Sequence, residues 1–113
     1  MMKYTAIYNM NSKFFRYPDE KIPTIDEIIQ SDDYCILGDV EAIDLEDAYY
    51  ILNMNHPEHI VEKVRELAAS DRNHTKYPTI HTSLSVCDIL VEDNPKGLKY
   101  YFCDNYGWEE IEA

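Results

Sequence analysis

The C-terminal part of the chain contains the pattern that most restricts its fold. Residues 84–92 (LSVCDILVE) and 98–103 (LKYYFC) are rich in apolar and aromatic residues and read as strands. Residues 93–97 between them (DNPKG) have the residue types of a tight hairpin turn. A second turn at 104–107 leads to a short last strand, 108–111. Consecutive strands joined by short turns predict an antiparallel β-meander.

Three short helices are predicted in the middle of the chain, each from a residue type that starts helices. Thr24 and Glu27 form a capping box, and Asp44 suits the N-cap of a second helix. Pro57 suits the first position of a third helix, because a proline lacks the N–H that would have no partner there. The predicted helices end near Gln30, Asn53 and Ala69.

The N-terminal half also contains β patterns. Residues 3–8 (KYTAIY) alternate between polar and apolar side chains, which is typical of a strand, and residues 14–17 read as a second short strand. Residues 34–43 (YCILGDVEAI) predict a longer strand that is interrupted at Gly38, and residues 70–82 read as a polar loop.

These elements predict one α+β domain over residues 1–113. We expect a mostly antiparallel sheet that ends in the β-meander, with two to three helices packed on one face. The chain contains no apolar run long enough to span a bilayer, and residues 1–11 do not have the pattern of a secretory signal. Three widely spaced cysteines, Cys35, Cys87 and Cys103, are expected to be reduced thiols in the cytoplasm.

Negative charge is concentrated in one segment. From Asp19 to Glu62 the sequence has 13 acidic residues and a single base, Lys21. The formal charge of this segment is therefore −12, the same as the formal net charge of the whole chain. Such a segment disfavours nucleic-acid backbones and anionic membranes as partners, because both are negatively charged, and it favours basic protein surfaces. Helix capping explains some of these acids, but it does not explain why compensating bases are missing.

Two C-terminal segments carry a resemblance to a known family. Residues 83–91 read SLSVCDILV and residues 100–108 read YYFCDNYGW, with the segment DLED at 44–47 upstream. Together they resemble the YodL-like family, small domains of prophages, conjugative elements and plasmids in Firmicutes. Cys87 stands where that family commonly has glycine. The resemblance implies a mobile-element context and carries no established catalytic residues. Free-standing proteins of such elements often act against host defences.

The leading hypothesis is therefore a non-enzymatic protein that inhibits a host defence protein, of the anti-CRISPR or anti-restriction type. It would occupy a basic surface that otherwise holds nucleic acid, for example on a CRISPR effector nuclease, and it would need no cofactor. Charge complementarity would speed association, and exposed aromatic side chains would prolong it. The residues predicted to bind the partner are Asp32, Asp33, Asp39, Glu41, Glu46, Asp47, Tyr49 and Tyr50.

Two other functions stay open. The chain could be a regulatory or scaffolding module that binds a protein encoded by the same element. It could also be a small enzyme in which His81 activates the thiol of Cys87 or Cys103. A buried cysteine is more often a small apolar residue, so the structural interpretation of these thiols is favoured.

Two further groups were weighed as chemical sites. His56 and His59 are spaced to share a metal ion, with Glu58 and Glu62 nearby, but Pro57 separates them and a solvated helix start is the favoured interpretation. Asp88 lies inside an apolar segment, where hydrogen bonds to a turn are its commonest explanation.

Overall fold

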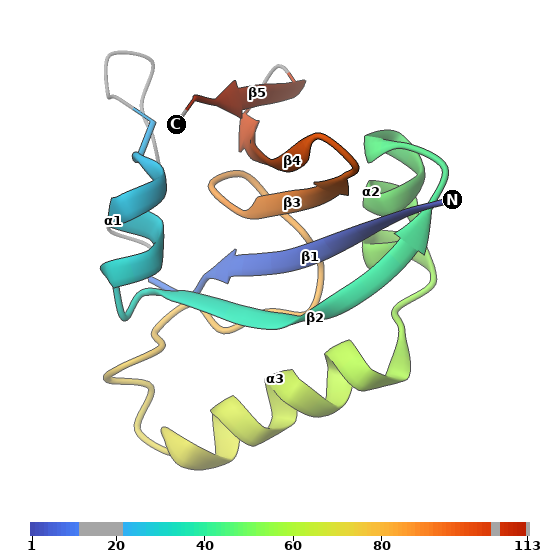
Figure 1. Cartoon of the computed structure of the whole chain (residues 1–113). Helices are drawn as coiled ribbons and strands as arrows, with labels where there is room; N and C mark the ends of the chain where they lie inside the picture. Colours follow the sequence, from blue (N-terminus) through green and yellow to red (C-terminus); the bar gives the residue numbers. More distant parts are fainter. Residues whose placement is uncertain (12–21, 105–106, 113) are drawn as a thin grey trace.

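A five-stranded antiparallel sheet and three helices make up the described part of the chain (Figure 1). The computed structural model describes residues 1–11, 22–104 and 107–112. The strands are β1 (Met2–Asn9), β2 (Tyr34–Ala42), β3 (Ile89–Asn94), β4 (Gly97–Asp104) and β5 (Gly107–Ile111). The helices are α1 (Ile25–Gln30), α2 (Leu45–Met54) and α3 (Glu58–Ser70). The strand order is β2-β1-β3-β4-β5, which confirms the α+β class and the C-terminal meander.

The helix starts follow the local signals of the sequence. The hydroxyl of Thr24 accepts a hydrogen bond from the Glu27 N–H at 3.2 Å, and the Glu27 carboxylate accepts one from the Thr24 N–H at 3.4 Å. The Asp44 carboxylate accepts a bond from the Asp47 N–H at 2.9 Å at the start of α2. Pro57 is the N-cap of α3, one position before the predicted one. Capping satisfies N–H groups that the helix itself cannot pair.

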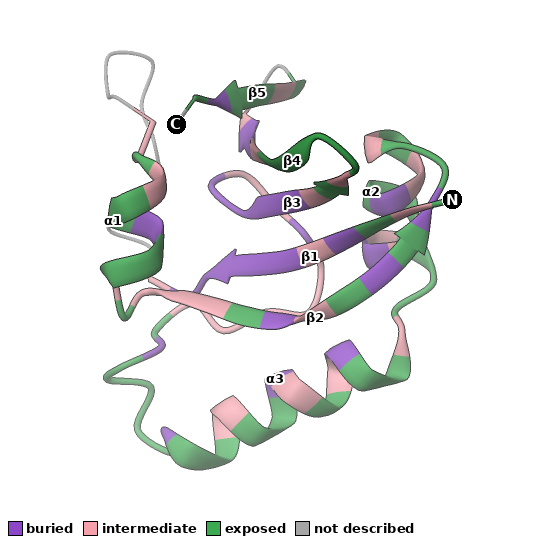
Figure 2. Ribbon diagram, viewed as in Figure 1, coloured by how far each residue is buried: buried purple, intermediate pink, exposed green. Residues whose placement is uncertain are grey.

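The sheet has a buried core on each face (Figure 2). On one face Tyr8 of β1 joins a core with Leu52 of α2 and Ile60 of α3. On the other face Ile7 joins a smaller core with Ile28 of α1. Two helices therefore share one face, within the number expected there, and α1 covers part of the opposite face. Neighbouring side chains of a strand point to opposite faces, so β1 contributes to both cores.

The strand predicted at residues 84–92 begins later than expected. β3 starts at Ile89, because residues 84–88 form a turn in which the Asp88 N–H bonds to the Ser85 carbonyl at 3.0 Å. Cys87 has φ +79°, a left-handed backbone conformation that glycine adopts most easily. The alternating apolar pattern of this segment thus reflects burial in a turn rather than strand pairing.

The two remaining strand predictions have different outcomes. The strand expected at residues 14–17 lies outside the described residues. β2 is continuous rather than interrupted, but its register with β1 shifts next to Gly38, since Ala6 pairs with Gly38 while Ile7 pairs with Ile36. This bulge places the backbone of Gly38 directly under α3.

Gly38 is expected to be the glycine least tolerant of substitution. It has φ +148°, and an added Cβ would lie 3.0 Å from Cδ2 of His59 and 3.3 Å from Cδ1 of Ile60. Gly97 is a matched control, because it also has a positive φ, +131°, but has open space around the added Cβ. Gly97→Ala should cost about 1–2 kcal/mol of unfolding free energy through backbone strain. Gly38→Ala should cost about 1–3 kcal/mol more, because the side chains of His59 and Ile60 on α3 must also give way.

Chemical denaturation of both variants measures this difference. Equal losses of stability, or a larger loss for Gly97→Ala, would contradict the close approach of α3 to β2.

Candidate functional site

The eight residues predicted to bind a partner do not form one surface. Asp32 and Asp33 lie in the turn between α1 and β2, where Asp33 has a structural role. Its carbonyl accepts a bond from the Met10 N–H at 2.9 Å, and its carboxylate accepts one from Nδ2 of Asn11 at 2.9 Å. Glu41 is eight residues farther along an extended strand, or about 26 Å away at the usual rise per residue. One small contact patch does not include both ends of β2.

Two of the predicted acids, Asp39 and Glu41, share a face of β2. In the strand register they lie opposite Thr5 and Lys3 of β1, and all four belong to the face on which α1 packs. The core under α1 includes Ile7, Ile89 and Val91, but of the β2 residues only Tyr34 packs against it. Asp39 and Glu41 are therefore exposed to solvent.

The other predicted residues lie on α2, against the opposite face of the sheet. The Asp47 carboxylate accepts a bond from the Ile43 N–H at 2.9 Å, so this acid fixes the helix start. Glu46, Tyr49 and Tyr50 are exposed, and the ring of Tyr49 meets the ring of Trp108 edge-on at 6.4 Å. The predicted set therefore divides into a turn, a sheet face and a helix.

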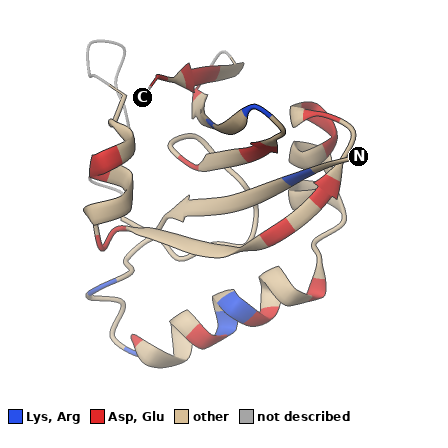
Figure 3. Ribbon diagram, viewed as in Figure 1, with Lys and Arg blue, Asp and Glu red and all other residues tan. Residues whose placement is uncertain are grey.

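The half of the sheet left open by α1 is the clearest candidate binding surface, and we call it the open sheet face. Asp39, Glu41 and Asp93 lie on it, and Lys3 is the one cation on it among the described strand residues. Figure 3 shows acidic residues on β2 and β3 on either side of the basic residue of β1 at this end of the sheet. The complete set is Lys3, Thr5, Ile36, Asp39, Glu41, Asp93 and Leu98.

Charge on the open sheet face is only partly balanced. The Lys3 ammonium lies 3.9 Å from the Asp39 carboxylate and 3.6 Å from the Asp93 carboxylate. These pairs are half exposed, so each contributes little stability. Ile36 and Leu98 are 63% and 61% exposed on the same face. The surface therefore combines excess negative charge with apolar contact area, the two properties that charged protein interfaces use.

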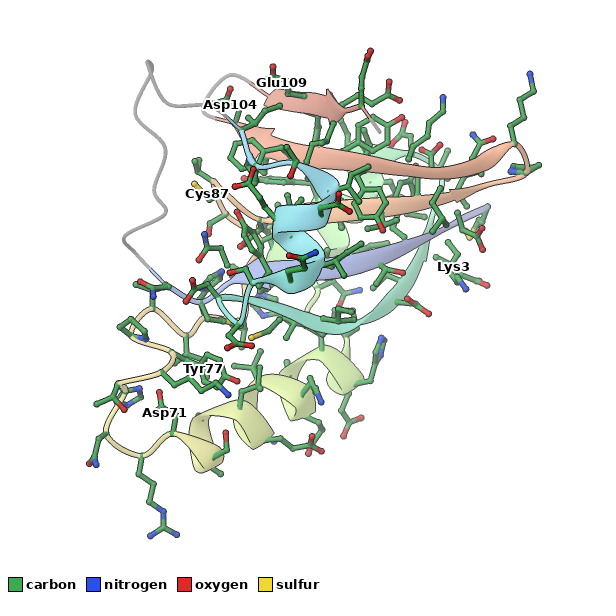
Figure 4. The ribbon with its side chains drawn as sticks, turned by 60° about the vertical axis from the view of Figure 1, so that its left-hand side comes forward. Lys3, Asp71, Tyr77, Cys87, Asp104 and Glu109 are labelled. Atoms are coloured by element: carbon green, nitrogen blue, oxygen red, sulfur yellow. The ribbon has the colours of Figure 1, made fainter. Side chains whose placement is uncertain are left out.

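A fully buried carboxylate lies at the other end of the sheet. Asp88 is 0% exposed, and its carboxylate accepts bonds from the backbone N–H groups of Asn9 and Ser85, each at 2.7 Å. Nε2 of His81 lies 3.0 Å from the same carboxylate. Figure 4 shows neighbouring Cys87 at the end of the sheet opposite Lys3. Asp88 thus connects its own turn to β1 and to the loop that contains His81.

Both ring nitrogens of His81 are already bonded. Nδ1 lies 2.6 Å from the Thr79 carbonyl, which can only accept, so Nδ1 carries a proton. Burial opposes the charged form of His81, but the hydrogen bond to Asp88 and its negative charge outweigh burial and raise the pKa of His81. Burial also raises the pKa of Asp88, against the effect of His81 and the two backbone donors. Because those donors favour a carboxylate, the shared proton belongs on His81.

This geometry argues against His81 as the base for a cysteine nucleophile. Nε2 bonds to Asp88 and Nδ1 bonds to Thr79, so neither nitrogen is left to accept a thiol proton. Burial, with the nearby Asp88 charge, raises the pKa of Cys103 to about 12, so this thiol is protonated at neutral pH. Cys87 is 2% exposed. His81 does not activate the hydroxyl of Ser85 either, which is 3.5 Å from Nε2 of His81 but donates to the closer Asp88 carboxylate, at 3.3 Å.

A cavity of about 250 Å³ lies beside the buried pair. It is lined by Asn9, Asn11, Thr79, His81 and neighbouring residues of the Asp88 turn. The His81 ring stacks on Tyr8, with ring centroids 5.1 Å apart and planes 5° from parallel. The stacking and the two hydrogen bonds hold the imidazole in one orientation, which suits a structural role.

The histidines weighed as metal ligands have different partners. Nε2 of His56 lies 3.0 Å from the Ser83 hydroxyl, and Nε2 of His59 lies 2.6 Å from the Asp39 carbonyl. Within the described residues, no three His, Cys, Asp or Glu side chains are grouped so that they could hold a metal ion. His59 instead covers a carbonyl of β2.

Sequence reasoning missed two features of these sites. It singled out His81 and Asp88 separately, but it did not pair them, since their contact depends on the path of an irregular loop. It also missed the contact between Tyr49 and Trp108, which are far apart in the sequence. The three acids within residues 44–47 at the start of α2 and the lone tryptophan were visible signals, but only the fold brings them together.

Comparisons with known proteins give no further guide to the site. No family model, curated protein or solved structure matches this chain. The similarity to the YodL-like family therefore stays a prediction. In the described part of the chain, no helix has the length and apolar character needed to cross a bilayer.

The His81–Asp88 pair should make stability depend on pH. The pKa of His81 is raised above its ordinary 6.5, so its contribution is complete below that value and is lost as pH rises through the folded-state pKa. His81→Gln should lower the unfolding free energy by about 1–3 kcal/mol near pH 6, and by less near pH 9. His56→Gln changes an exposed histidine and is the control for the loss of one imidazole from the chain.

Urea denaturation across this pH range measures both differences. A loss for His81→Gln that is the same at both ends of the range would contradict an imidazolium–carboxylate pair.

Proposed function

We propose that this protein is a small acidic inhibitor from a phage or mobile element that binds a host defence protein. It would cover a basic surface that holds nucleic acid, on a CRISPR effector nuclease or a restriction enzyme, and it would act by binding rather than by catalysis. The observation that supports this most is the open sheet face. There Asp39, Glu41 and Asp93 outnumber Lys3, beside the exposed apolar side chains of Ile36 and Leu98.

The physical basis is charge complementarity over a surface of fixed shape. The strands hold the carboxylates of Asp39 and Glu41 two residues apart on one face, so little side-chain ordering is needed beyond the backbone. The formal charge of −12 attracts a basic surface before contact, which raises the association rate. After contact, burial of Ile36 and Leu98 would slow dissociation.

Two alternative functions can be distinguished from the proposed one by experiment. The identity of the partner distinguishes a scaffolding module, and thiol alkylation distinguishes an enzyme. A regulatory or scaffolding module would bind a replication or transfer protein of the same element rather than a host nuclease. A small Cys/His enzyme would lose its biological effect when its thiols are alkylated. The raised pKa of Cys103, caused by burial and by Asp88, and the two hydrogen bonds of His81 favour binding over that chemistry.

Charge reversal on the open sheet face tests the proposal. The double variant Asp39→Lys, Glu41→Lys should inhibit nucleic-acid binding by the target nuclease at least about tenfold less well than wild type. Wild-type inhibition should also weaken as salt rises, because salt screens exposed charges. The measurement is displacement of labelled DNA from purified CRISPR effector complexes and restriction enzymes of a Firmicutes host, at low and at physiological salt.

The control Asp32→Lys, Glu66→Lys changes the net charge equally, in the turn before β2 and on α3 eight residues beyond Glu58. It should stay within about threefold of wild type, because both substitutions lie outside the open sheet face and salt screens exposed charges over distance. Equal loss in both double variants would assign the effect to net charge rather than to this face. Failure of the wild type to displace DNA from every nuclease tested would refute the defence-inhibitor function.

A further inference from the structure

A groove of about 480 Å³ lies on the other face of the sheet, between α2 and the β4–β5 hairpin. We call it the α2 groove. Glu46 and Tyr49 line it from the helix, and Asp104 and Trp108 line it from the strands. Val86 is also part of its lining. Its volume is within the range of about 300–1,000 Å³ that is typical of small-ligand sites.

Two aromatic rings form the walls of the α2 groove. Trp108 lies opposite Cys103 in the β4–β5 register, and Cys103 belongs to the core under α2, so the indole points toward that helix. The ring of Tyr49 meets it edge-on, with planes at 84° and centroids 6.4 Å apart. Tyr49 is 44% exposed, so this contact does not bury the phenol as a core residue would be buried. Aromatic faces attract cations through their electron density.

The carboxylate of Glu46 adds negative charge to the same groove. Glu46 is three residues before Tyr49 on α2, so the two side chains lie on one side of the helix. Asp104, the last residue of β4, also lines the groove, but strand alternation directs its side chain to the face of Phe102 and Glu109, and Figure 4 shows it near Glu109. The described lining residues include neither lysine nor arginine. A ligand for this groove should therefore be a cation with a flat apolar surface.

We propose that the α2 groove binds the guanidinium group of an arginine side chain on a basic partner protein. A guanidinium is planar, stacks on aromatic rings and bonds to carboxylates through two N–H groups at once. A lysine ammonium is more strongly hydrated and offers no flat surface, so it fits this combination less well. The proposal rests on the proposed function for the basic character of the partner, but arginine binding itself requires no partner.

The fluorescence of Trp108, the single tryptophan of the chain, reports on this site directly. The probe is arginine capped as Nα-acetyl-arginine amide, titrated at constant ionic strength near 0.15 M, where the Debye length is about 8 Å. We expect a saturable change with a millimolar dissociation constant. Capped citrulline, a neutral analogue of the same shape, should bind at least about tenfold more weakly, and capped lysine about threefold more weakly.

Three variants assign the binding to the groove. Tyr49→Leu and Glu46→Gln should each weaken capped arginine about threefold to tenfold, because each removes one attraction for the cation. Tyr50→Leu is the matched control, since Tyr50 follows on the same helix, is 58% exposed and does not line the groove. It should bind as wild type. Glu46→Gln changes an exposed side chain, so it should keep its fold and test the site even where Tyr49→Leu is unstable.

Several results would overturn the assignment. A non-saturable signal, equal binding of citrulline or equal binding of lysine would each refute recognition of a guanidinium. Wild-type binding by both Tyr49→Leu and Glu46→Gln, or an equal loss in Tyr50→Leu, would place the effect outside the groove. The variant Asp39→Lys, Glu41→Lys should still bind capped arginine, because its substitutions lie on the opposite face. The groove and the nuclease-inhibitor function can therefore fail independently.

Discussion

The buried carboxylate of Asp88 is the interaction on which the rest of the structure depends. It holds the Asn9 N–H at the end of β1, the Ser85 N–H of its own turn and the His81 ring of the preceding loop. The backbone of Asp88 continues the connection, since its carbonyl accepts a bond from the Cys103 N–H at 2.9 Å. An ionised group at zero exposure is costly unless every lone pair is satisfied. These donors bond to the carboxylate oxygens of Asp88, and they thereby connect the end of β1, the loop with His81 and the turn before β3.

This junction also explains why Cys87 tolerates its positive φ. Hydrogen bonds on both sides of it, from the Cys87 N–H to the Cys103 carbonyl and from the Cys103 N–H to the Asp88 carbonyl, fix the turn in place. A strained conformation persists where its surroundings over-determine it. The turn places Val86 in the lining of the α2 groove, and β3 begins directly after it at Ile89. One irregular turn therefore positions both part of a candidate site and a central strand.

Sequence reasoning succeeded where the signal was local. Thr24, Asp44 and Pro57 each start a helix through contacts within a few residues. The turn predicted at 93–97 does join two paired strands, but it is limited to residues 95–96, because Asp93, Asn94 and Gly97 belong to the strands. It failed at residues 84–88, because the apolar pattern there looks like a strand unless His81 and Asn9 are known to reach Asp88.

The candidate site was only partly predictable for the same reason. The two-residue spacing of Asp39 and Glu41 implies a common face. Whether that face is open depends on where α1 packs, and the sequence of α1 does not say which half of the sheet it covers. Asp33 and Asp47 were chosen as surface charges, yet they bond to Asn11 and to the Ile43 backbone.

The two outer strands have a further consequence for behaviour at high concentration. On β2, the Asp39 carbonyl already accepts a hydrogen bond from Nε2 of His59, at 2.6 Å. Helix α3 packs alongside this strand. On β5, Glu109 and Glu110 are both exposed, so a second copy approaching edge to edge would bring like charges together. Pairing of a second copy with the β2 edge is opposed because the Asp39 carbonyl already has a partner. Pairing with the β5 edge is opposed by repulsion between glutamates of the two copies. This arrangement therefore opposes amyloid-like stacking of copies at high protein concentration.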